Sequence, residues 1–84
     1  MSNPITVMTD KVMRMIKSMV YMSMRVSYRR GATTDDISGF LAEWTPGEES
    51  IYHPGIVERA LIDLQSDGLV TRAGARWYPV RVAA

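Results

Sequence analysis

The sequence contains no cysteine and a single histidine, His53. Without cysteine the chain cannot form disulfides, thiolate zinc sites or a cysteine nucleophile. With one histidine, a tetrahedral zinc site would have to rely almost entirely on carboxylates, so we expect neither a metal nor a cofactor. No glycine-rich phosphate-binding motif occurs, and no arrangement of serine, histidine and aspartate is indicated. We therefore expect no catalytic residues and no enzyme activity.

Long hydrophobic runs are also missing. Four basic residues interrupt the apolar stretch from residue 8 to residue 26: Lys11, Arg14, Lys17 and Arg25. This pattern indicates neither a signal peptide nor a membrane-spanning helix. Together with the absence of cysteine, it leads us to expect a cytoplasmic protein that does not bind membranes.

The 84 residues, 46% hydrophobic and 23% charged, are typical of one small folded domain spanning residues 1–84. The net charge is only +1, but it is unevenly distributed. Residues 1–30 carry six Lys or Arg against one Asp, residues 31–53 carry five acids and no Lys or Arg, and residues 54–84 carry four Arg against three acids. The total charge therefore does not by itself indicate a nucleic-acid partner.

A long helix is predicted over residues 9–29. The Thr9 hydroxyl can cap it, Asp10 suits its first turn, and Gly31 follows its end. The residues expected to face the core are Val12, Ile16, Met19, Val20, Ser23 and Val26.

The same helix carries a second apolar stripe, because Met8, Met15 and Met22 recur every seven residues while Met13 and Met24 lie elsewhere. An exposed methionine-rich surface often marks a partner interface, which here indicates a homodimer. Methionine also fills irregular gaps in cores. The sequence leaves both alternatives open.

A second helix is predicted over residues 33–44. Thr33 and Asp36 have the spacing of a capping box, and the Pro46-Gly47 pair breaks the helix. Its apolar face comprises Ile37, Phe40, Leu41 and Trp44.

A third helix is predicted over residues 54–67, with Pro54 in its first turn and Ser50 or His53 as its cap. Its apolar face comprises Val57, Ala60, Leu61 and Leu64. Gly68 stops it because glycine accepts the left-handed conformation. Alternating residues around a glycine-containing turn then predict a hairpin over residues 69–82, whose second strand lies at an edge where Pro79 cannot donate a hydrogen bond.

Three helices followed by a hairpin, with the third helix passing through D-G-L-V into the first strand, resemble the winged helix-turn-helix superfamily from Thr9 to Val82. The implied fold is α+β and mostly α, with the hairpin as the wing. The implied function is a bacterial or phage transcriptional regulator that binds double-stranded DNA through its third helix and wing. The DNA contacts that the resemblance implies are His53, Gly55, Glu58, Arg59, Ile62, Arg72, Arg76 and Trp77.

Arg59 is the strongest of these candidates, because its planar fork can bind guanine O6 and N7 or a phosphate. The alternative is that Arg59 pairs with Asp63 one helical turn away. Negative charge on the expected DNA side favours a second function, a winged-helix protein-interaction module that does not bind DNA. The acids concerned are Glu58, Asp63, Asp35 and Asp36.

Four aromatic residues suggest base stacking with single strands. They are Trp44, Tyr52, Trp77 and Tyr78. Because buried aromatics dominate the energetics of small cores, we favour the alternative that they close the core beneath the loop and the hairpin.

Overall fold

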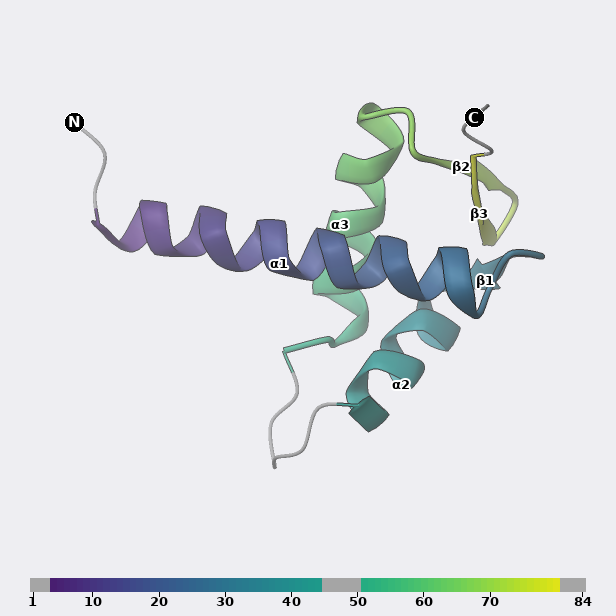
Figure 1. Cartoon of the computed structure of the whole chain (residues 1–84), viewed down its shortest axis with the longest axis horizontal. Helices are drawn as coiled ribbons and strands as arrows, with labels where there is room; N and C mark the ends of the chain where they lie inside the picture. The colour runs from purple at the N-terminus through teal and green to yellow at the C-terminus, as the bar shows by residue number, and fades with distance from the viewer. Residues whose placement is uncertain (1–3, 45–50, 81–84) are drawn as a thin grey trace.

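The computed structural model describes residues 4–44 and 51–80, with side chains from Asp10 onward. The elements are α1 (Pro4–Val26), β1 (Ala32–Thr33), α2 (Thr34–Trp44), α3 (Pro54–Ser66), β2 (Val70–Ala73) and β3 (Arg76–Pro79). The predicted class, α+β and mostly α, is confirmed. Figure 1 shows α1 running the length of the molecule across α3, with α2 beside its second half and the strands at its C-terminal end.

The bounds of α1 differ from the prediction at both ends. The helix begins at Pro4, so Thr9 lies within it and is not its cap. Proline suits a first turn because the N–H that it lacks would have no partner inside the helix. The helix ends at Val26, three residues earlier than predicted, and the chain turns through Gly31 with φ +98° into β1.

The predicted capping box at the start of α2 is confirmed. The Asp36 N–H donates to Thr33 Oγ1 at 3.1 Å, and the Thr33 N–H donates to Asp36 Oδ2 at 3.1 Å. These two bonds satisfy backbone donors that the helix cannot satisfy itself. Because Thr33 is the cap, α2 begins one residue later than predicted.

The ends of α3 also follow the predicted signals. His53 is its cap, accepting a hydrogen bond from the Ile56 N–H through Nδ1 at 3.4 Å. At the other end Asp67 caps the helix, and Gly68 adopts φ +79°. The Leu69 N–H then donates back to the Leu64 carbonyl at 3.0 Å, which closes the turn into β2.

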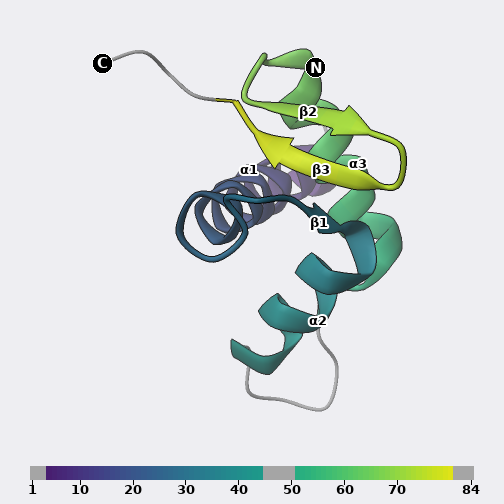
Figure 2. The same ribbon diagram turned by 90° about the vertical axis from the view of Figure 1, so that its right-hand side faces the viewer.

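The sheet has one strand more than predicted. β1 pairs antiparallel with β3, so that the order is β1-β3-β2 and β3 is central (Figure 2). Two residues are too few for an alternating pattern, which is why the sequence did not reveal β1. Among residues 4–44 and 51–80, β1 pairs only with Trp77 and Arg76, so β3 has a single neighbouring strand at Pro79, as predicted.

The core lies between the three helices and the inner face of the hairpin. The predicted buried face of α3 is confirmed in full. On α1 the prediction is only half right, because Val12, Met19 and Val26 are exposed while Met24 is fully buried. The buried row of α1 runs at four-residue spacing through Ile16, Val20 and Met24. Rows of this spacing form the ridges that commonly pack against another helix.

The aromatic residues divide between core and surface. Trp77 is fully buried and Tyr52 nearly so, which confirms the favoured interpretation for these two. That interpretation is wrong for Trp44, which is 71% exposed and packs against Phe40 with ring centroids 5.8 Å apart. Trp44 is the last residue of α2.

Candidate nucleic-acid interface

The outer surface of α3 is the side turned away from the core. Gly55, Arg59 and Ile62 recur at spacings of four and three residues and are all exposed, as is the cap residue His53. Gln65 continues the row three residues after Ile62 and is exposed too. The sequence-based candidates omitted Gln65, although the same helical spacing would have found it.

Arg59 lies in the middle of this outer row. Among the described residues its guanidinium has no hydrogen-bond or ion-pair partner, so the alternative pairing with Asp63 is not formed. The side chain therefore presents its donors to solvent. A guanidinium without a protein partner is available to bind a base edge or a phosphate.

Arg72, on β2, is held in place by three neighbours. Its Nη2 lies 3.8 Å from Glu58 Oε1 on α3, and its Nε donates to the Gly74 carbonyl at 3.1 Å. Its guanidinium carbon lies 4.9 Å from the ring centroid of Trp77. Arg72 and Glu58, which are both candidate DNA contacts, are thus present at the surface, but each offsets the charge of the other.

Trp77 is not a surface residue, and the expectation that it contacts DNA is wrong. Its side chain is fully buried, and its Nε1–H donates to Thr34 Oγ1 at 3.1 Å. Strand alternation places Trp77 on the inner face of β3 and the exposed Arg76 on the outer face. Arg76 Nη1 lies 3.4 Å from the Gly31 carbonyl oxygen, to which it donates.

A cleft of about 420 Å³ separates the start of α3 from the hairpin and the start of α2. Its charged lining comprises the carboxylates of Asp35 and Glu58 and the guanidinium of Arg72. The remaining lining residues are Thr33, Thr34, Pro54, Gly55 and Ala75. An approaching phosphate would meet more negative than positive charge here, so the cleft itself is a poor anion site.

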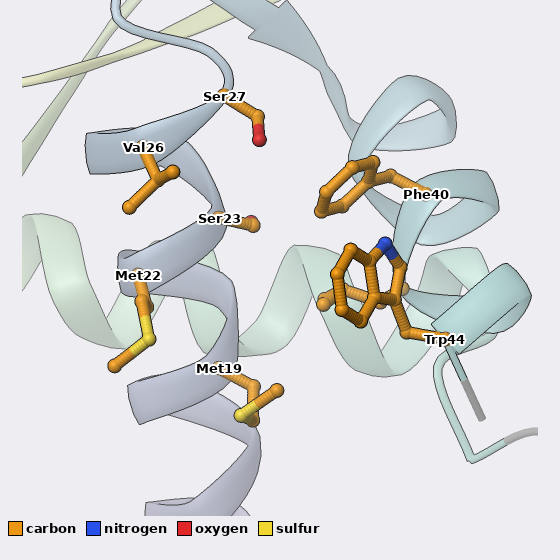
Figure 3. Close-up of a pocket in the computed structure, with 8 residues that line it drawn as sticks. Met19, Met22, Ser23, Val26, Ser27, Phe40 and Trp44 are labelled. Atoms are coloured by element: carbon orange, nitrogen blue, oxygen red, sulfur yellow. The ribbon is translucent and has the colours of Figure 1, made fainter.

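A second concave surface lies on the other side of α2. The groove has a volume of about 170 Å³ and is lined by Met19, Met22, Ser23, Val26, Ser27, Phe40, Leu41 and Trp44. Figure 3 shows Phe40 and Trp44 projecting from α2 toward α1 across it. Met15 and Met22 are exposed, which excludes the alternative that these two fill gaps in the core. The Met8 side chain lies outside the described part of the chain.

Comparisons with protein-family models, curated proteins and solved structures found no match to this chain. Within residues 4–44 and 51–80, no helix combines the length and apolar character needed to cross a membrane. The same part of the chain holds no group of three or more potential metal ligands. The surfaces described above are therefore the basis for any functional proposal.

Proposed function

We propose that this protein is a small winged-helix transcriptional regulator that binds double-stranded DNA, with α3 in the major groove and the hairpin against the backbone. The observation that carries the proposal is Arg59, exposed and without a partner among the described residues, at the centre of the outer row of α3. Arginine contacts to guanine O6 and N7 are the commonest specific contacts in the major groove. A bacterial or phage regulator of this kind acts in the cytoplasm, which is the localisation that we propose.

The neighbours of Arg59 have the chemistry to read further bases. Ile62 is 48% exposed and can contact the methyl group of thymine, while the amide of Gln65 can bind adenine N6 and N7. His53 at the start of α3 and Arg76 on β3 are both exposed and can contact phosphates, which fix the register of a protein on DNA.

The test is binding of a labelled mixed-sequence duplex, followed by fluorescence anisotropy at several salt concentrations. We expect affinity to fall steeply with salt, because each phosphate contact releases counterions. Arg59→Ala should weaken binding more than the loss of one charge elsewhere does, and on a duplex that contains the preferred site the loss should be roughly 5- to 150-fold, the range of one good base contact. Arg14→Ala is the matched control, since it removes the same charge from an exposed position on α1.

Two outcomes would contradict this proposal. One is the absence of binding to any duplex at low salt in protein with an unchanged circular dichroism spectrum. The other is an equal loss of affinity in Arg14→Ala and Arg59→Ala, which would show that only net charge matters.

A protein-interaction module that does not bind DNA is the second candidate function. The observation in its favour is the neutralisation of Arg72 by Glu58, beside a cleft that also contains Asp35. A surface potential without a continuous positive band across α3 and the hairpin would favour it, as would the absence of duplex binding. A second copy of the chain, bound through the exposed face of α1, is a further proposed partner under either function.

A further inference from the structure

Five large apolar side chains form a continuous exposed stripe on α1. Their exposed fractions lie between 38% and 72%, and they are separated by alternating steps of three and four residues. The stripe comprises Val12, Met15, Met19, Met22 and Val26. Steps of three and four residues are the spacing of the a and d positions in a coiled coil.

The fold does not use this stripe. A different row of α1 packs into the core. It comprises Ile16, Val20 and Met24, each of which is at most 1% exposed. The two rows lie side by side on the helix, so α1 packs one apolar face against the body of the protein, and the described part of the chain leaves the other exposed. Monomeric proteins rarely expose contiguous apolar patches larger than a few hundred Å².

We propose that α1 pairs in parallel with α1 of a second copy of this chain, with the stripe as the seam of a two-stranded coiled coil. Val12, Met19 and Val26 then occupy a positions, and Met15 and Met22 occupy d positions. A second copy of the chain is the partner that fits this stripe, because two identical stripes with heptad spacing can pack against each other in register.

The size of the exposed apolar surface on α1 agrees with a second copy of the chain as its partner. The stripe from Val12 to Val26 is about 21 Å long at 1.5 Å per residue. At its C-terminal end, the groove beside Met22 and Val26 adds the faces of Phe40 and Trp44. The combined surface is on the order of several hundred Å² per copy, which approaches the ~800 Å² per partner of a standard interface.

Charge on the flanks selects the parallel direction. Lys11, Ser18 and Arg25 each precede an a position, are exposed, and so occupy g positions on one flank of the seam. An antiparallel pair places g beside g and would bring Lys11 close to Arg25 of the second copy. A parallel pair places g beside e and so keeps the two basic flanks apart.

The absence of cysteine from the chain makes the seam directly testable by disulfide cross-linking. In a parallel pair, Val12→Cys, Met19→Cys and Val26→Cys should each cross-link to itself under oxidation, because identical a positions face one another. Gln65→Cys, exposed on α3, is the control and should stay uncross-linked. The parallel arrangement is overturned if Val12→Cys cross-links only when mixed with Val26→Cys.

Sedimentation equilibrium of the whole chain, without DNA, provides the second measurement. We expect a mass twice the 9.5 kDa of one chain, and more than a tenfold weaker association in Met15→Glu and Met22→Glu. Ile62→Glu is the matched control, since Ile62 is equally exposed but lies on α3. A monomer mass at every concentration, or an equal effect of Ile62→Glu, would overturn the proposal whether or not the protein binds DNA.

Discussion

Glu58 Oε1 lies 3.8 Å from Arg72 Nη2, so an ion pair joins α3 to the hairpin within the surface that we propose for DNA. Both side chains are more than 40% exposed, and a surface pair of this kind contributes at most about 1 kcal/mol to stability. Its larger effect is on binding. While the pair is formed, Glu58 competes with a phosphate for the guanidinium of Arg72.

Replacing Glu58 by glutamine should therefore strengthen DNA binding. Glu58→Gln releases Arg72 for a phosphate contact, which should raise affinity roughly fivefold at low salt and steepen the logarithmic salt slope by about 0.9. Anisotropy titrations at several salt concentrations measure both. Glu43→Gln changes the net charge equally at the far end of α2, so an identical gain there would rule out this role for the Glu58–Arg72 pair.

Two glycines should respond in opposite ways to alanine. Gly31 has φ +98°, and an added Cβ would overlap the Tyr78 ring, so Gly31→Ala should lower the free energy of unfolding by about 1–3 kcal/mol. Gly39 lies inside α2 with nothing within 4 Å of an added Cβ. Gly39→Ala should therefore raise stability by roughly 0.5–1 kcal/mol. Urea denaturation of both variants tests this, and equal effects would contradict the geometry of the turn before β1.

The two tryptophans should differ in stability and fluorescence. Trp77→Phe removes buried volume and the hydrogen bond to Thr34, so we expect a loss of about 2–4 kcal/mol. Trp44→Phe changes an exposed side chain and should stay within about 0.5 kcal/mol of the parent protein. In dilute, monomeric protein, the Trp77 that remains in Trp44→Phe should emit at short wavelength, whereas the Trp44 that remains in Trp77→Phe should emit as a solvated indole. Reversed emission would contradict the burial of Trp77.

Tyr28 should make the protein less stable at alkaline pH. Burial, followed by the charges of Asp36 and Glu43, raises the pKa of the Tyr28 phenol above 10.0, so the folded state favours the neutral form. This contribution is complete below pH 10 and is lost as pH rises through the folded pKa. Tyr28→Phe should reduce the loss of stability above about pH 10 in urea denaturation. A pH profile unchanged by Tyr28→Phe would show that other groups cause the loss.

Local signals predicted most of the helical framework. The capping box of Thr33 and Asp36, the cap at His53 and the glycine stop at Gly68 depend on residues within one turn of each other, and the structure contains all three. β1 could not be predicted, because Ala32 and its neighbour form a strand only through pairing with β3, more than 40 residues later.

Periodicity alone did not decide which face of α1 is buried. The helix has two adjacent apolar rows, and only packing against α2, α3 and β3 selects the row containing Val20 and Met24 over the row containing Met19 and Val26. In the candidate site, likewise, one feature could be predicted from the sequence and another could not. The exposure of Arg59 follows from helical spacing, whereas the contact between Glu58 and Arg72 depends on how the hairpin folds back onto α3.

The central claim, that α3 and the hairpin bind duplex DNA, is tested most directly by an NMR titration of the whole protein with a mixed-sequence duplex at low and moderate salt. We predict amide shift changes concentrated in residues 53–62 and 72–76, which shrink as salt rises. The exposed stripe of α1 should be unaffected. Shifts confined to α1 and α2, or none at low salt, would contradict the claim.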